Sequence, residues 1–319
     1  MCSAPCASRK PTRRATALRS PRQHKRLVDQ PHSPVLLGAV LEFLPAGECR
    51  RLVDGTVGGG GHAAALLERH PGLELLGIDR DEHALAIARR RLAPFEGRTT
   101  LVQSHFSRFG ECMDKLGWQT ADMLLFDIGV SSMQLDQPER GFSYRHDGPI
   151  DMRMGGEGET ALELMERLDE SELADVIYRY GEERFSRRIA RRIKEALAGG
   201  SLSSTTDLAK ICAASYPRGR HRLDPAARTF QALRIAINDE LGELERMLDQ
   251  VPDRLASGGR LGVICFHSLE DRMVKQRLLK WKQESRAKII TKKPIRADRN
   301  ELERNPRASS AKLRVCQWL

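Results

Sequence analysis

The pattern of apolar and polar positions predicts short buried strands that alternate with amphipathic helices. Four segments with apolar residues have the length of strands: residues 51–54, 73–79, 99–103 and 123–127. The last of these is continuously apolar, as in a strand buried on both faces. Three helical patterns accompany them: residues 38–44, a run from His62 to about Pro71, and residues 81–92. This alternation predicts an α/β fold with a doubly wound, mostly parallel sheet.

The alternation stops after residue 127 and a mainly helical stretch follows. Four helical patterns are expected in it, at residues 161–168, 171–180, 182–198 and 206–215, with Ser171 as an N-cap and Gly199-Gly200 as a stop. A long helix at 238–255 then leads into a strand at 259–266, and residues 288–291 and 313–317 could form a closing antiparallel pair. We therefore expect a discontinuous sheet domain, residues 31–134 and 226–319, with a helical domain inserted at residues 135–225.

A glycine-rich loop follows the first predicted strand. Residues 55–61 contain five glycines and lie between Asp54 and His62. Glycine allows positive φ and close approach of the backbone to a ligand. The loop lacks the Gly-Lys-Ser/Thr of a phosphate-binding P-loop and the Gly-x-Gly-x-x-Gly spacing of dinucleotide sites. Asp54 favours a ligand with a cationic part, which points to S-adenosylmethionine rather than NAD. The alternative is a flexible surface loop.

Polar side chains stand at the carboxyl ends of the other predicted strands, where ligands bind in such sheets. Asp79 is placed to accept hydrogen bonds from ribose hydroxyls, or else to cap the helix that follows. Asp127 is placed to accept from the amine of a substrate, or else is a turn residue. His267 follows the last strand of the parallel set, as a site residue or as a satisfied polar residue.

Charge and cysteine content narrow the classes of protein. The net charge is +10, and residues 1–30 alone hold eight Lys and Arg against one acid. We expect this stretch to be a disordered basic extension, because it is rich in Arg, Ser and Pro. Seven scattered cysteines without a Cys/His motif argue against structural zinc, so no metal is expected, and they fit a reducing cytoplasm. No apolar run reaches the ~18 residues of a membrane span, so no membrane partner is expected.

Two local clusters of basic residues are candidates for contact with RNA phosphates, although either could be a solvated surface. One lies in the helix expected at residues 182–198 and comprises Arg184, Arg187, Arg188, Arg191, Arg192 and Lys194. The other, residues 286–314, holds ten basic residues against three acids and is the better candidate.

Eight motifs, in order along the chain from His32, resemble the small-subunit ribosomal RNA (cytosine-N4)-methyltransferase family. They are Asp54-Gly55-Thr56 with Gly60-Gly61-His62, Asp127-Ile128-Gly129-Val130-Ser131-Ser132 with Gln134-Leu135-Asp136, Arg140-Gly141-Phe142-Ser143, Asp147-Gly148-Pro149 with Asp151-Met152-Arg153-Met154, Tyr180-Gly181-Glu182-Glu183-Arg184, Arg228-Thr229-Phe230-Gln231-Ala232-Leu233-Arg234, Phe266-His267-Ser268-Leu269-Glu270-Asp271-Arg272 and Asn305-Pro306-Arg307-Ala308-Ser309-Ser310. Met133 stands where the family often has Pro, the segment between Lys282 and Asn305 looks shorter than in some relatives, and residues 1–30 have no counterpart.

The resemblance implies a class I S-adenosylmethionine-dependent methyltransferase fold with an inserted helical domain. It implies methylation of N4 of a cytidine in the decoding region of small-subunit ribosomal RNA, as RNA or as the assembled small ribosomal subunit, in the cytoplasm. The cofactor-binding positions carried over by motif are Gly60, Gly61, His62, Asp79, Phe106, Asp127 and Gln134, and Asp127 is also the expected catalytic residue.

Other questions remain open at this stage. Phe142 and Tyr144 are candidates for stacking on the target base, or are packing residues. The rival functions are a non-catalytic ribosome-assembly or RNA-binding factor and, less favoured, a nucleotide-dependent dehydrogenase, for which we find neither the glycine spacing nor a hydride-transfer residue set. The sequence leaves the oligomeric state open.

Overall fold

The computed structural model describes residues 34–45, 47–217, 219 and 224–319. The expected basic extension, residues 1–30, lies outside the described residues.

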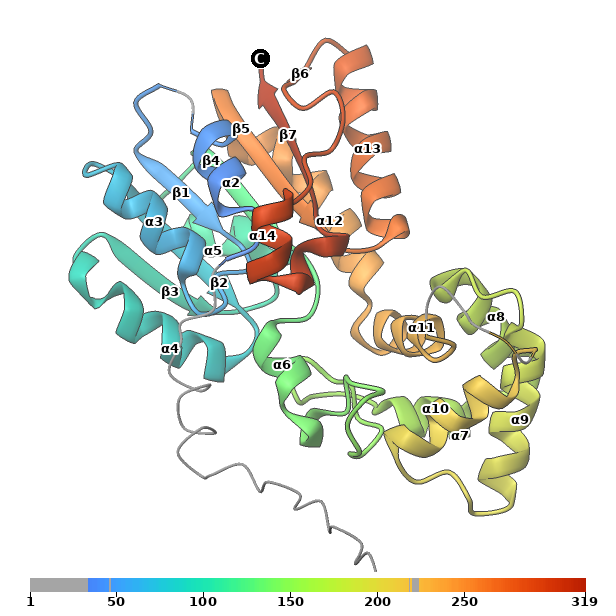
Figure 1. Ribbon diagram of the computed structural model, residues 1–319. Coiled ribbons are helices and arrows are strands. Elements are labelled where there is room, and N and C mark those ends of the chain that lie inside the picture. Colours follow the sequence, from blue (N-terminus) through green and yellow to red (C-terminus); the bar gives the residue numbers. More distant parts are fainter. Residues whose placement is uncertain (1–33, 46, 218, 220–223) are drawn as a thin grey trace, which may run out of the picture. The chain divides into compact units, whose positions relative to one another are not determined.

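A seven-stranded sheet forms the centre of the structure, in the order β3-β2-β1-β4-β5-β7-β6 (Figure 1). Its strands are β1 Arg51–Asp54, β2 Glu74–Asp79, β3 Thr99–Gln103, β4 Ala121–Asp127, β5 Leu255–Cys265, β6 Ala287–Ile289 and β7 Lys312–Trp318. Strands β1 to β5 pair in parallel, and β7 runs antiparallel to β5 and to β6. This arrangement confirms the predicted fold class and the predicted antiparallel pair. The strand order reverses between β1 and β4, where ligands bind in doubly wound sheets.

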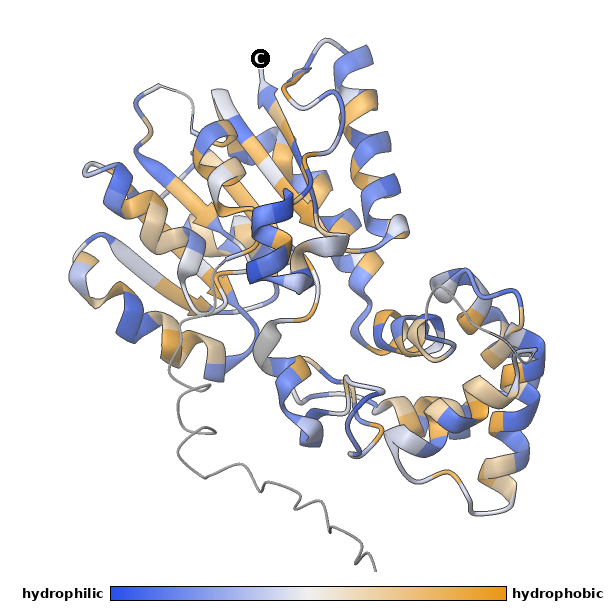
Figure 2. Ribbon diagram, in the orientation of Figure 1, coloured by the Kyte–Doolittle hydropathy of each residue, from blue (hydrophilic) through white to orange (hydrophobic). Residues whose placement is uncertain are grey.

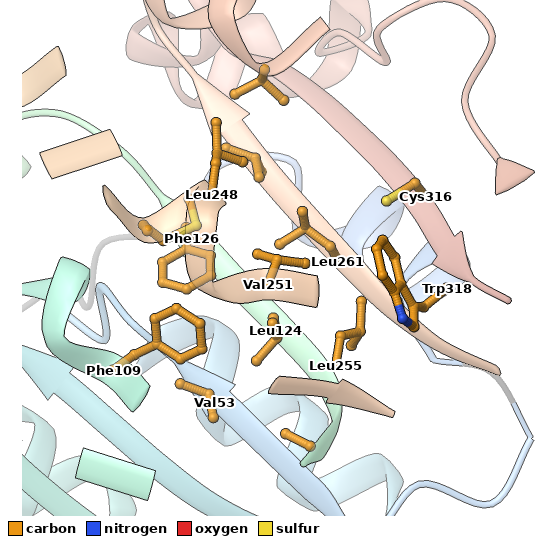
Figure 3. Close-up of a cluster of buried hydrophobic side chains, with 14 of the residues drawn as sticks. Val53, Phe109, Leu124, Phe126, Leu248, Val251, Leu255, Leu261, Cys316 and Trp318 are labelled. Carbon is orange, nitrogen blue, oxygen red and sulfur yellow. The ribbon is translucent and has the colours of Figure 1, made fainter. Parts of the chain in front are cut away.

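Helices cover both faces of the sheet because alternate residues of its strands point to opposite sides. On one face, Val53 of β1 and Leu124 and Phe126 of β4 pack in a buried cluster with helices α5 and α12 (Figure 3). On the other face, Leu52 and Leu125 pack with α2, α3 and α4. Figure 2 shows the resulting apolar strands between helices with polar outer faces. The helices are α2 Leu37–Phe43, α3 Gly61–Arg69, α4 Glu82–Leu92, α5 Phe109–Lys115, α12 Glu240–Arg254 and α13 Ser268–Gln283.

The chain between β4 and α12 forms a helical insert with its own buried core. Its helices are α6 Ser132–Asp136, α7 Ala161–Arg167, α8 Glu170–Gly181, α9 Ser186–Ala198, α10 Thr205–Ala214 and α11 Ala227–Asn238. A third buried cluster joins residues of α7 to α10 with Phe230 and Leu233 of α11. The core of the insert thus includes α11, and the domain boundaries predicted above stay predictions. The remaining elements are α14 Arg299–Arg304 and the 3-10 turns η1 Ala93–Phe95, η2 Phe106–Arg108, η3 Pro138–Arg140 and η4 Pro306–Ser310.

Three predicted helix starts are wrong. Helix α12 begins at Glu240 rather than at residue 238, because Asn238 ends α11 and Asp239 between the two helices adopts a left-handed conformation (φ 46°). Helix α8 is capped by Asp169 rather than Ser171, because the Asp169 carboxylate accepts from the Glu172 N–H while the Glu172 side chain accepts from the Asp169 N–H. Helix α9 begins at Ser186 rather than at residue 182, because Glu182 adopts a left-handed conformation (φ 50°) that ends α8. Arg184 therefore lies outside the helix to which it was assigned.

Candidate active site

The candidate site lies at the carboxyl edge of the sheet, where β1 and β4 are neighbours. Their register pairs Val53 with Leu124 and Asp54 with Leu125, so Asp54 and Asp127 leave the sheet at the same edge. The loop after β1 and the start of the helical insert after β4 therefore face the same space. This is the position where a doubly wound sheet binds its ligand.

The glycine-rich loop after β1 is held on both sides. The Gly55 N–H donates to Leu125 O of β4 and the Val57 N–H donates to Ile78 O of β2, both at 2.9 Å. Gly60 has φ 76° and caps α3, and a Cβ on Gly61 would lie 2.6 Å from the ring of Pro34. Both positions thus require glycine. These contacts contradict the flexible-loop alternative and leave the backbone of the loop in a fixed shape.

Three carboxylates gather around this loop. Burial raises the pKa of Asp54 to about 7, and the charges of Asp127 and Asp79 add to the rise, while His62 and the Thr56 N–H oppose it. Burial likewise raises the pKa of Asp79, against the N–H groups of Asp81 and Gly58. Repulsion among three close carboxylates favours the binding of a cation between them. The site thus has the electrostatic character expected for a ligand with a positive sulfur or ammonium group.

His62 and Asp127 carry polar atoms that are buried and unsatisfied. His62 Nε2 lies 3.7 Å from Asp127 Oδ2, too far for a hydrogen bond. Both ring nitrogens of His62, and Asp127 Oδ1, have no hydrogen-bond partner among the described residues. A buried polar atom left in this state costs roughly 1–3 kcal/mol, so these atoms are suited to contact with a ligand. The amino group of S-adenosylmethionine or of a nucleobase has the donors that Asp127 lacks.

Asp79 ties the glycine-rich loop to the end of β2. Its Oδ2 accepts from the Gly58 N–H and its Oδ1 from the Asp81 N–H, both at 2.9 Å. It does not cap α4, because Asp81 does so by accepting from the His83 N–H at 3.0 Å. An ionised carboxylate has about four acceptor positions, so two remain for ribose hydroxyls. The ribose contact stays a prediction.

Phe106 and Gln134 have structural contacts of their own. The Phe106 ring is half-buried and lies tilted against Phe126, with ring centroids 6.0 Å apart. Gln134 is buried, forms a capping box with Ser131 at the start of α6, and donates to Asp81 Oδ2 at 3.3 Å. No recorded contact joins either residue to His62 or Asp127. Their roles toward a cofactor therefore stay predictions.

Sequence reasoning missed a junction between the residues that follow Asp79 and the connecting loop, residues 140–154. Arg140 donates to Asp81 Oδ2 at 3.3 Å and to Met154 O at 2.8 Å. The buried Asn238 accepts from Arg80 at 3.1 Å and from the Met154 N–H at 2.9 Å. Arg80 and Asp81, the two residues directly after Asp79, are thus linked by hydrogen bonds to the backbone of Met154. Asn238 links Arg80 to it, and Arg140 links Asp81. In the sequence Asp81 has the position of a helix cap, and no local pattern indicates that Asn238 forms long-range hydrogen bonds.

The two aromatic residues proposed for base stacking differ in exposure. Phe142 is only 6 % exposed and packs in the core of the insert, with the Arg140 guanidinium over its ring. Tyr144 is half-buried, stands edge-on to Phe230, and has the Arg145 guanidinium over its ring. The burial of Phe142 favours a packing role. Tyr144 remains the better candidate for contact with a base.

Glu240, His267 and Glu270 form a buried group with the spacing of metal ligands among the described residues. However, Arg234 donates to both oxygens of Glu240, at 2.6 and 2.8 Å, and His267 Nε2 lies 3.0 Å from Glu270 Oε1. A divalent ion would add positive charge beside this guanidinium, so the group is better explained as an ion network that joins α11, α12 and α13. His267 also caps α13, which supports its structural interpretation. The expectation of no metal stays a prediction.

Comparison with known proteins adds independent information. A family model described as the MraW methylase family matches residues 29–319. The ribosomal RNA small subunit methyltransferase H of Nitratidesulfovibrio vulgaris (strain DP4) is 52% identical over 306 residues, which cover 90% of this chain and 95% of that protein. The protein of the same name from Synechococcus sp. (strain CC9605) is 54% identical over 298 residues, covering 90% and 97%. The crystal structure of a precorrin-6y C5,15-methyltransferase from Geobacter metallireducens covers 89% of this chain at 10% identity, with a TM-score of 0.42.

Proposed function

Because the chain belongs to the MraW methylase family, we propose that it transfers a methyl group from S-adenosylmethionine to the exocyclic N4 of a cytidine in small-subunit ribosomal RNA. The predicted family and the predicted enzyme class, a ribosomal RNA methyltransferase, are confirmed by this membership. The rival classes, a dehydrogenase and a non-catalytic assembly factor, have no comparable support. The cytidine, its N4 atom and its place in the decoding region belong to the proposal.

The unsatisfied His62–Asp127 pair beside the fixed glycine-rich loop is the observation that carries the proposal. When bound, S-adenosylmethionine supplies an electrophilic methyl group on a positively charged sulfur. Asp54, Asp79 and Asp127 surround the loop, and a bound cation favours their ionised forms because it offsets the burial and mutual repulsion that raise the pKa of Asp54. The backbone of Gly60 and Gly61 can lie against the ligand because neither residue has a Cβ. Asp79 has acceptor positions left for the ribose.

Asp127 is the residue best placed to act on the acceptor. The exocyclic nitrogen of cytosine is conjugated with the ring and is a poor nucleophile. A carboxylate that accepts from its N–H bonds favours the form in which the nitrogen lone pair is available, and methyl transfer then depends on alignment. The Asp127 N–H donates to Thr56 Oγ1 at 2.6 Å, which fixes the backbone of the residue. Its free Oδ1 is the acceptor that such an N–H requires.

The proposed partner is small-subunit ribosomal RNA, alone or in the assembled subunit. Among the basic residues of α9, Arg188 donates to Ser215 O and Lys194 to Met165 O, so these two side chains stabilise the insert. Arg187 and Arg191 are both exposed, but Arg191 Nε lies 3.8 Å from Glu195 Oε1, so Arg187 is the more available of the two for phosphates. Among the residues that the structure describes, no helix has the length and apolarity needed to span a membrane. The cytoplasmic location stays a prediction.

The experiment uses small ribosomal subunits from a strain that lacks the gene for this protein. The purified protein and labelled S-adenosylmethionine should introduce N4-methylcytidine into the subunit RNA, as identified by mass spectrometry of its nucleosides. Parallel assays with protein-free RNA separate the two substrate forms. Methylation at another atom, or none on either substrate, would refute the proposal.

Replacing Asp127 by Asn should lower turnover by about 10²–10³-fold, because the charged acceptor is lost while the shape is kept. The fold should be unchanged by circular dichroism. Calorimetric titration with S-adenosylmethionine shows whether Asp127 contacts the cofactor or the cytidine. Unchanged cofactor affinity assigns it to the cytidine amine, and reduced affinity assigns it to the methionine end. Near-normal turnover at saturating substrates would reduce Asp127 to a turn residue.

Replacing Asp79 by Ala should weaken binding of S-adenosylmethionine by on the order of 2–3 kcal/mol, since charge-assisted bonds to the ribose are lost. The same calorimetric titration measures this. The variant also loses the Gly58 and Asp81 contacts, so Asp79→Asn serves as its comparison: an amide oxygen still accepts hydrogen bonds, although without charge. Wild-type affinity in the Ala variant would remove Asp79 from the cofactor site.

A further inference from the structure

The chain that follows β6 forms a short loop anchored at both ends. The Thr291 N–H donates to Val315 O at 3.2 Å, and the Val315 N–H donates to Thr291 Oγ1 at 2.9 Å. The N–H groups of Ile295 and Leu313 each donate to the carbonyl of the other, both at 2.9 Å. Only Lys292, Lys293 and Pro294 lie between these anchors, and both lysines are exposed. Because proline also restricts the backbone, the two ammonium groups are held on a preorganised loop.

The sheet register places this loop at the edge that carries Asp127. Ile295 pairs with Leu313, Leu313 pairs with Ile264 of β5, and Ile264 pairs with Asp127 of β4. These residues form one transverse row across the sheet. Neighbouring strands are about 4.8 Å apart, so the backbone at Ile295 lies roughly 14 Å from that at Asp127. A few nucleotides of extended RNA cover that distance.

The basic residues of segment 286–314 divide into paired and free groups. Four have carboxylate partners: Lys312 and Arg314 with Asp271, Arg307 with Asp136, and Arg299 with Glu303. In contrast, Lys292, Lys293 and Arg296 are exposed and form no ion pair with any described residue. The nearest acid in sequence, Asp298, is occupied in capping α14 through the Glu301 N–H. Arg286, Lys288 and Arg304 also form no ion pair with a described residue: the Arg286 guanidinium lies over the Trp318 ring, Arg304 donates to Asn300 O within α14, and Lys288 is in β6. Of the cations without an ion pair, Lys292, Lys293 and Arg296 are the ones beside the anchored loop.

We propose that Lys292, Lys293 and Arg296, here called the phosphate clamp, bind RNA backbone phosphates next to the nucleotide held at Asp127. This inference rests on the proposed function and adds a surface that is separate from the helical insert. Contacts to phosphates fix the position of a nucleic acid, while contacts to bases choose the sequence. The clamp therefore sets where the RNA strand crosses the edge of the sheet, and the site around Asp127 selects the base.

The matched control for this surface lies on α13. Lys275, Lys280 and Lys282 are also exposed, so changing them removes the same charge. Helix α13 starts at the carboxyl end of β5, and in its last turn Trp281 packs edge-on against Trp318, at the opposite end of the sheet. Its last lysines are therefore far from the Asp127 row. If net charge alone governs RNA binding, both triple variants lose affinity for RNA. If the position of the charge matters, only the clamp variant does.

The experiment compares Lys292→Gln/Lys293→Gln/Arg296→Gln with Lys275→Gln/Lys280→Gln/Lys282→Gln and with wild type, using small ribosomal subunits over a range of KCl concentrations. The clamp variant should raise KM for subunits and flatten its log-log salt dependence by about 0.7–0.9 per lost contact. Its kcat at saturating subunits and its affinity for S-adenosylmethionine should match wild type. The α13 variant should keep the wild-type slope. Lys292→Arg/Lys293→Arg/Arg296→Lys should restore the slope, because the charges return.

The possible failures are distinct. If the wild-type protein does not methylate the subunits, the proposed function fails. If wild type is active but the clamp variant keeps the wild-type salt slope, or the α13 variant loses slope equally, the phosphate clamp is refuted while the proposed function stands.

Discussion

The raised pKa of Asp54 gives the electrostatics of the site a measurable effect on the stability of the protein. It is buried beneath the glycine-rich loop, and burial raises its pKa from 3.8 to about 7. In the unfolded chain the same group titrates near its ordinary value. Between these two pH values the folded protein holds a proton that the unfolded chain has released. Stability therefore falls as pH rises through this interval, by on the order of 4 kcal/mol for the whole shift, and is level above it.

The variant Asp54→Asn should remove this pH-dependent component. Its free energy of unfolding, relative to wild type, should increase as pH rises from about 4 to about 7 and then stay constant. Urea unfolding at several pH values measures the difference, and the exposed Glu68→Gln variant is the control. Parallel pH profiles for wild type and Asp54→Asn would show that Asp54 ionises normally in the folded protein.

For single residues, the sequence predicted the acidic residues of the site but not the contacts that surround them. Asp54, Asp79 and Asp127 could be chosen because each follows an apolar strand, and strand ends carry the ligands of such folds. That both ring nitrogens of His62 and Oδ1 of Asp127 are left without hydrogen-bond partners depends on the packing of β1, β4 and α3 together, which no local pattern contains. Asn238 could not be found for the same reason, since it bonds to residues far away in the chain.

The charged side chain of Lys194 stabilises the end of helix α7. Lys194 of α9 donates to Met165 O at 2.7 Å and to Glu166 O at 3.1 Å, both in the last turn of α7. The last carbonyls of a helix have no partner within the helix and carry negative partial charge. Lys194 therefore caps α7 and holds two helices of the insert together.

Replacing Lys194 by Met should lower the free energy of unfolding by about 1–2 kcal/mol, because the stem is kept while the capping charge is lost. Arg187→Met is the matched control, since Arg187 is on the same helix and exposed. Thermal and urea unfolding compare the two variants. If both have wild-type stability, Lys194 is as dispensable as a surface lysine.

Strands were easier to predict than helices in this chain. β1 and β3 have the predicted limits, whereas β4 begins at Ala121, two residues before its predicted start. Helix α13 was missed because charged residues surround most of it and its buried positions, Glu270, Val274, Leu278 and Trp281, include an acid. The start of α9 was misplaced because a left-handed non-glycine residue, Glu182, leaves no mark in the sequence.

The whole molecule is organised around a sheet that the helical insert interrupts. β4 and β5 are neighbours in the sheet, although α6 to α12 lie between them in sequence. Contacts of this kind are slow to form, because a long loop must close before they contribute. The sequence predicted this interruption from the change in period after residue 127, and it could not show that α11 shares the core of the insert.

Removal of residues 1–26 should leave folding and methyl transfer unchanged. This stretch has no apolar periodicity and its composition is that of a disordered segment. A protein that starts at Leu27 should show the wild-type melting temperature and wild-type turnover on small subunits at moderate salt. Loss of either property would mean that the basic stretch contributes to the fold or to the substrate.

The position of β7 has a consequence for the newly made protein. β7 is the last strand in sequence, yet it lies between β5 and β6 and contributes to the buried clusters on both faces of the sheet. As the chain leaves the ribosome, β6 emerges before β7, its neighbour in the sheet of the described residues. A translation product that stops before Lys312 would keep the glycine-rich loop but lack the residues with which β7 completes the two buried clusters. Such a fragment exposes apolar surface that the complete sheet buries, so we expect it to be degraded by proteases faster than the full-length chain.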